Sequence, residues 1–175
     1  ALLNEFFDVV VAEVEADGGY LDQFQGDAAL AVFGAPAPLP DPATAALGVA
    51  RRLAEALTAR LPEYGSGIGV SYGEVVAGYV GSATRFEYTV IGDAVNEAAR
   101  LCELAKAGPG RVLASGRALA AGTPEEAGRW RAGEDVMLRG VEDVRDEVEM
   151  DDLPQPAEAW DDQPAPVPDA TEVPM

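Results

Sequence analysis

The chain has 175 residues, 48% of them hydrophobic, which fits one domain with an apolar core. A formal net charge of −19 argues against nucleic-acid or anionic-membrane binding as the main activity. The chain has no histidine, which excludes histidine catalysis and histidine metal ligands, and its one cysteine, Cys102, excludes an internal disulfide. Any metal site would therefore use carboxylates, which favour Mg²⁺, Mn²⁺ or Ca²⁺ over Zn²⁺.

Helical and strand-like patterns alternate through the first part of the chain. Apolar residues recur at helical spacing over residues 3–14, which predicts a helix. Because no capping residue comes ahead of them, we expect that this helix begins before residue 1 and that the chain is a fragment of a longer protein. Two short strands follow around a Gly26-Asp27 turn. A proline-rich loop then leads to Asp41, which can cap a helix over residues 42–61.

The second half continues with more strands than helices. The patterns predict β structure over 65–81 and 86–92, a helix over 93–106 capped by Asp93, and a turn and strand over 108–115. Segments 136–140 and 145–150 are candidates to close the sheet. We therefore expect an α+β fold in which helices cover a mostly antiparallel sheet.

The composition changes at about Met150. The last 26 residues hold six prolines, seven acidic residues and no basic residue, which predicts a disordered acidic tail at 150–175 behind a domain at 1–149. No apolar run reaches 18 residues and no basic, apolar leader opens the chain, so we expect neither a membrane span nor a secretory signal in this segment.

Several polar residues are weak signals when each is taken alone. Asn96 and Arg100 lie one helical turn apart and should share a face, but an exposed arginine is usually only solvated. Gly-Asp pairs such as the one that contains Asp27 are ordinary turns. Gln23, Thr89 and Arg139 fit plain strand or turn positions. Composition and spacing alone indicate a soluble α+β domain with a candidate anion site.

The combination of three segments is far more specific. "FQGDAALAVFGAP", "GIGVSYGEVVAGYVGSATRFEYTVIGDAVNEAARL" and "VMLRG" occur in this order. Together they closely resemble the class III nucleotide cyclase catalytic domain of adenylyl and guanylyl cyclases, over about residues 1–148. The resemblance implies a ferredoxin-like domain that dimerises, with active sites at the interface. It also implies cyclisation of a nucleoside triphosphate by attack of its 3′-oxygen on the α-phosphate, assisted by two Mg²⁺ or Mn²⁺ ions.

The resemblance also implies roles for individual residues. Asn96 would orient the ribose and Arg100 would stabilise the phosphates in the transition state, both for the site shared with the partner chain. Asp27 would hold metal, and Arg139 would bind the terminal phosphates. The family's other metal-binding aspartate, in a pattern like F-x-D-x-x-G-F ahead of the opening helix, does not occur here. We therefore expect an N-terminally truncated domain that is nearly inactive alone.

The resemblance does not by itself predict whether the domain selects adenine or guanine. The family reads the purine with a lysine, where this chain has Gln23, and with an aspartate or threonine, where it has Thr89. A glutamine amide can donate to adenine N1 or accept from guanine N1, so Gln23 leaves both bases open. Because the glutamate usual in guanylyl cyclases is absent, ATP is the expected substrate.

Other functions remain alternatives at this stage. The chain could be a non-catalytic cyclase-like subunit that pairs with a fuller partner, a guanylyl-preferring cyclase, or a plain acidic interaction domain. The preferred hypothesis is that the chain is a cytoplasmic adenylyl cyclase domain that makes cyclic AMP, as a homodimer or as a heterodimer with another cyclase chain. Its parent protein could be tethered to the inner face of the plasma membrane, although this segment itself would contact neither membrane nor nucleic acid.

Overall fold

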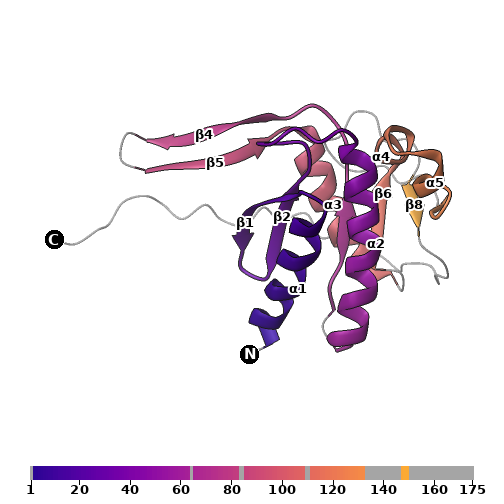
Figure 1. Cartoon of the computed structure of the whole chain (residues 1–175). Helices are drawn as coiled ribbons and strands as arrows, with labels where there is room; N and C mark the ends of the chain where they lie inside the picture. Colours follow the sequence, from indigo (N-terminus) through magenta and orange to yellow (C-terminus); the bar gives the residue numbers. More distant parts are fainter. Residues whose placement is uncertain (1, 64, 83–84, 109–110, 133–146, 150–175) are drawn as a thin grey trace, which may run out of the picture.

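Figure 1 shows the computed structural model, which describes residues 2–63, 65–82, 85–108, 111–132 and 147–149. In chain order, its elements are α1 (Leu2–Ala16), β1 (Tyr20–Gln25), β2 (Ala28–Val32), α2 (Pro42–Arg60), β3 (Ile68–Val70), β4 (Val76–Ser82), β5 (Arg85–Ile91), α3 (Asp93–Ala107), β6 (Val112–Ser115), α4 (Gly116–Ala121), α5 (Pro124–Ala127), β7 (Arg131–Ala132) and β8 (Glu147–Glu149).

The strands form three separate sheets among the described residues. β1 pairs with β2, and β4 with β5, each as an antiparallel hairpin. The remaining strands lie in the order β3-β6-β8-β7, in which only the β3–β6 pair is parallel. The predicted α+β fold with a mostly antiparallel sheet is confirmed. The segment at 145–150 does supply a strand of the sheet, but β8 lies between β6 and β7 and so does not close it.

Helix α2 separates two apolar clusters. On one side it packs against α1, where the helical spacing predicted from the sequence buries Phe6, Val10 and Val14 beside Leu53. On the other side it packs against β3, β6 and α4, in a cluster of Leu47, Ala50, Ala54, Val70, Val112, Ala114, Ala118 and Trp130. Burying an apolar side chain of this size contributes about 1.5–3 kcal/mol. Because α2 takes part in both clusters, it holds the two halves of the domain together.

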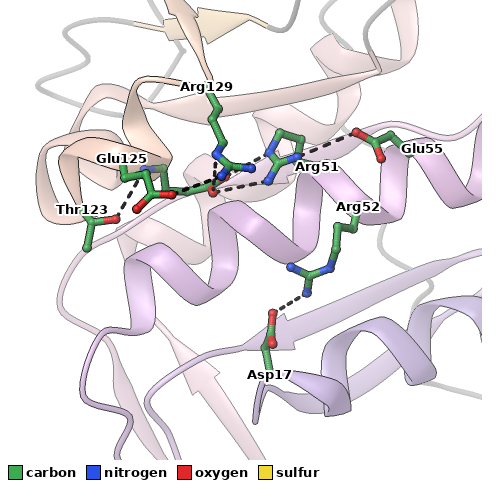
Figure 2. A network of polar contacts seen from close by, with 8 residues as sticks. Asp17, Arg51, Arg52, Glu55, Thr123, Glu125 and Arg129 are labelled. Atoms are coloured by element: carbon green, nitrogen blue, oxygen red, sulfur yellow. Dashed lines mark hydrogen bonds and ion pairs between the residues drawn. The ribbon is translucent and has the colours of Figure 1, made fainter.

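Ion pairs join α2 to the elements on both sides (Figure 2). Arg51 Nε donates to Glu126 Oε1 of α5 at 3.1 Å, and Arg129 Nε lies 3.7 Å from the other oxygen of Glu126. On the opposite side, Arg52 donates to Asp17, just after α1. The Glu126 side chain is only 11% exposed, so its pair with Arg51 is screened less than a surface pair would be.

The two predicted helix caps turn out differently. Asp41 caps α2, because its Oδ1 accepts a hydrogen bond from the Thr44 amide at 3.1 Å. The prediction that Asp93 caps α3 is wrong. The N-cap residue is Gly92, which has no side chain to offer, and Asp93 is the first helical residue, with an exposed side chain. In that position Asp93 still places its carboxylate near the positive end of the helix.

The β4–β5 hairpin leaves the body of the domain as a long two-stranded arm (Figure 1). Three large apolar side chains are exposed on it or at its base: Val76 and Tyr79 at 76% and Ile91 at 57%.

Among the described residues, no helix combines the length and apolarity that a membrane span requires. The tail predicted at 150–175 and the segment at 136–140 lie outside the described residues.

Candidate functional site

The β1–β2 hairpin carries Asp27 at its tip. Gly26 has φ +63°, a left-handed conformation that favours glycine and lets the chain reverse in a tight turn. Asp27 is exposed just behind it. Further back, β1 contains a bulge between Leu21 and Gln23, which leaves Asp22 without a partner in the ladder. Bulges of this kind redirect a side chain away from the regular alternation of the strand.

A groove of about 520 Å³ is lined by residues of both β2 and β3. Its walls are mostly apolar side chains from α1 and α2, such as Phe6, and it extends to α3 at Cys102. Gln23 and Asp27 of the β1–β2 hairpin both line it. In the described part of the chain, β2 pairs only with β1, and β3 pairs only with β6, so each strand has one edge without a strand partner.

Helix α3 lies against β3 at unusually short range. A methyl group on Gly69 would overlap the Ala98 carbonyl oxygen and the Cys102 amide nitrogen of the helix backbone. Gly67 meets the following turn of α3 in the same way. This close packing buries Leu101 completely and leaves Asn96 and Arg100 exposed. The predicted shared face of Asn96 and Arg100 is therefore directed to solvent.

A buried carboxylate fixes the first turns of α3. Glu97, next to Asn96, is only 1% exposed. The Ser71 hydroxyl donates to its Oε2, and Arg117 Nη2 donates to its Oε1 at 3.2 Å. Both carboxylate oxygens are thus satisfied by groups from the end of β3 and from α4, which is what burial of a charge requires. The sequence analysis did not single out Glu97.

The two hairpins meet through a polar contact. The Thr89 hydroxyl of β5 donates to Asp22 Oδ2 at 2.8 Å, across 67 residues of sequence. The rings of Tyr20 and Tyr88 pack edge to face nearby, with centroids 5.8 Å apart. Asp22 Oδ1 is buried and has no hydrogen-bond partner among the described residues. The side chain beside Thr89 is therefore Asp22, a residue that the sequence analysis did not name.

Comparison with known proteins places this geometry in a family. The family model described as the adenylate and guanylate cyclase catalytic domain matches residues 1–150. The chain belongs to that family. Two uncharacterized proteins of Mycobacterium tuberculosis are similar to it: Rv1320c is 52% identical over 161 residues, and Rv1318c is 55% identical over 139 residues. The alignments cover 91% and 79% of this chain but only 28% and 26% of those proteins.

Solved cyclase structures share the fold. The guanylyl cyclase Cya2 is 26% identical, with a TM-score of 0.67 over 89% of this chain and 81% of that chain. The adenylyl cyclase CyaB from P. aeruginosa has a TM-score of 0.69 over 86% of this chain and 81% of that chain, and its 24% identity supports the fold alone. The ferredoxin-like cyclase fold predicted from the sequence is confirmed, and both substrate classes occur among the neighbours.

The cyclase domain brings only some of the predicted site residues together. Gln23 and Asp27 line one groove, whereas Asn96 and Arg100 project to solvent from α3. Thr89 contacts Asp22. Arg139 lies outside the described residues.

The described residues do not fit a two-metal site by themselves. No three of their His, Cys, Asp or Glu side chains converge into a metal-binding group. Asp27 is therefore a single exposed carboxylate at the hairpin tip, and one carboxylate is a poor ligand set for two divalent ions.

Cys102 of the cyclase domain should react slowly. Its Sγ donates to the Gly67 carbonyl oxygen at 3.2 Å, and burial raises the pKa of the thiol. A raised pKa keeps the thiol protonated at pH 8, and the thiolate is the reactive form. We expect iodoacetamide to label Cys102 in the folded chain at least about tenfold more slowly than in the urea-unfolded chain. Equal labelling rates in the two states would contradict this prediction.

Proposed function

We propose that this domain is the catalytic part of an adenylyl cyclase that converts ATP to cyclic AMP and pyrophosphate in intracellular signalling. The observation that carries the proposal is the exposed pair Asn96 and Arg100 on α3. In the described part of the chain, no carboxylate lies within ion-pair distance of Arg100, so its guanidinium is available to an anionic ligand. A guanidinium donates to two phosphate oxygens at once, and an amide can both donate to and accept from ribose hydroxyls.

The arrangement also supports action as a dimer. Asp27 lines the groove, whereas Asn96 and Arg100 project away from the domain, so one chain does not enclose a nucleotide between them. A second cyclase chain that covers α3 would supply the missing half of the site. Val76 and Ile91 are partners in the β4–β5 ladder and lie on one face, so together they offer exposed apolar surface for such a contact.

The groove between β2 and β3 supports a further part of the proposal. The unpaired edges of β2 and β3 can hydrogen-bond a strand on both sides, and the apolar walls can bury its side chains. We propose that a segment ahead of residue 1 in the natural protein fills this groove as a central strand. A carboxylate on that strand would then stand near Asp27, which lines the same groove, and complete the metal ligands.

The test compares the chain with the full-length natural protein that contains it. With ATP and Mn²⁺, we expect the full-length protein to form cyclic AMP and the chain of residues 1–175 to form at least about a hundredfold less, because one carboxylate is a poor ligand set for two ions. Robust turnover by the chain alone would contradict the two-carboxylate proposal. A full-length protein that forms neither cyclic AMP nor cyclic GMP would contradict the enzymatic function.

A non-catalytic subunit is the second candidate. Such a chain would lend Asn96 and Arg100 to a complete partner and would have no use for a metal ligand at the hairpin tip. The exposed Asp27, which lines the groove, therefore favours the enzyme. Cyclic nucleotide formation only after mixing with a second cyclase would support the subunit.

A further inference from the structure

The contact between the two hairpins points to a residue that controls which base is accepted. Thr89 donates its hydroxyl proton to Asp22 Oδ2 at 2.8 Å. A carboxylate can only accept, so this contact fixes the direction of the hydrogen bond. Its proton is thus already used, and among the described residues no donor hydrogen-bonds to the Thr89 oxygen, so its lone pairs can accept from a ligand. From its environment alone, Thr89 is therefore an acceptor for any ligand that reaches it.

The fold places Asp22 beside Thr89 at a structural cost. Asp22 is the extra residue of the β1 bulge, because the ladder passes from Leu21–Ala31 directly to Gln23–Leu30. Its other oxygen, Oδ1, is buried without a hydrogen-bond partner among the described residues. An unsatisfied buried acceptor destabilises a fold, because the hydration that it loses is not replaced. A bulge and an unsatisfied oxygen retained at one position call for an explanation beyond folding.

There is room for a ligand on the Thr89 side of the arm. Thr89 faces Gly78 across the β4–β5 ladder, so these two positions lie on the same face. A methyl group built on Gly78 would have no atom within 4 Å. The space above Gly78, on the face that also carries Thr89, is therefore not filled by another side chain of the described residues, and a flat ring can approach Thr89 across it.

We infer that Asp22 is a positioning residue for base selection: by holding the Thr89 hydroxyl as an acceptor, it selects a purine that presents an amino group, as adenine does at N6. Guanine presents an oxygen at the corresponding position, and two acceptors would face each other without a proton between them. This inference rests on the proposed cyclase function and adds to it the residue that sets the preference for ATP. Asp22 acts through Thr89 and does not itself contact the base.

The test uses Asp22→Asn in the full-length protein. An asparagine amide can donate to the Thr89 oxygen, which frees the Thr89 proton to meet guanine O6. We expect the ratio of kcat/KM for ATP to that for GTP to fall about tenfold. Asp17→Asn is the matched control, because it makes the same chemical change at a carboxylate that pairs with Arg52 and not with Thr89. Its ratio should stay within about twofold of the wild type.

A double-mutant cycle separates positioning from a general structural effect. If Asp22 acts through Thr89, then Asp22→Asn should change the ratio in the wild type and leave it unchanged in a Thr89→Val background. Thr89→Val alone should also lower the ratio, and it provides the test if Asp22→Asn does not fold. An unchanged ratio in Thr89→Val, or in a folded Asp22→Asn variant, would overturn the inference.

Other outcomes distinguish this inference from the proposed function. A wild-type protein that prefers GTP would overturn the role of Asp22 and Thr89 while leaving the cyclase function intact. A wild-type protein without any cyclase activity would overturn both. Equal effects of Asp22→Asn in the wild-type and Thr89→Val backgrounds would show that Asp22 acts independently of Thr89, which also contradicts the inference.

Discussion

Replacing Arg100 with alanine in the full-length protein is expected to lower kcat at least about a hundredfold while changing KM for ATP little. Negative charge builds on the phosphate oxygens as the 3′-oxygen attacks, and a guanidinium held in place by a rigid helix stabilises that charge without reorganisation. Loss of one such donor typically costs about 3 kcal/mol of transition-state stabilisation. The measurement is the steady-state rate of cyclic AMP formation over a range of ATP concentrations.

Two further variants sharpen the Arg100 test. Arg100→Lys keeps the charge but loses the two-pronged donor, so its kcat should fall between those of the wild type and the alanine variant. Arg60→Ala is the matched control, because Arg60 is an exposed arginine at the last turn of α2. An unchanged kcat with a raised KM would show that Arg100 only binds the ground-state nucleotide, and the role proposed for it would be wrong.

A side chain at Gly69 should separate α3 from the sheet. A methyl group there overlaps backbone atoms of Ala98 and Cys102, which cannot rotate away as a side chain would. We expect Gly69→Ala to lower the free energy of unfolding by about 3 kcal/mol, at the upper end for an overpacked core, and the melting temperature by about 10 °C. Thermal unfolding of the chain followed by circular dichroism measures this change directly.

Gly78→Ala is the control for thermal stability, because a methyl group at Gly78 has no atom within 4 Å. Its melting temperature should stay within about 2 °C of the wild type. If both glycine variants melt alike, the close approach of α3 to β3 is not needed for stability. If Gly69→Ala keeps its melting temperature but the full-length variant loses kcat, the spacing serves to place Asn96 and Arg100.

The long helices could be predicted from the sequence because their burial follows a helical period. α1, α2 and α3 each begin within a residue or two of the predicted start. The short helices α4 and α5 were missed, although their caps were present. Ser115 and Thr123 accept hydrogen bonds from the backbone three residues on, and Thr-Pro-Glu-Glu at 123–126 is a capping-box pattern. Six and four residues are too few to show a period.

Prediction of the candidate site was limited by contacts that only the fold creates. Asn96 and Arg100 could be placed on one face because both lie on the same helix, four residues apart. The neighbour of Thr89 could not be identified in this way, because Asp22 lies 67 residues away in the sequence and reaches Thr89 through a bulge and through the packing of two hairpins. Glu97 was missed for the same reason, since its partners come from β3 and α4.

The β4–β5 arm has a consequence for how the domain responds to its surroundings. A two-stranded hairpin with exposed apolar residues is only marginally stable in water, so its ordered population depends on whatever surface clamps it. β5 passes through Gly92 directly into α3, so the end of the arm and the turn that carries Asn96 are one continuous piece of chain. A partner that orders the arm therefore also fixes the strand end that leads into α3, and dilution below the affinity of that partner should loosen the arm while α3, held by Glu97 and by its packing on β3, stays in place.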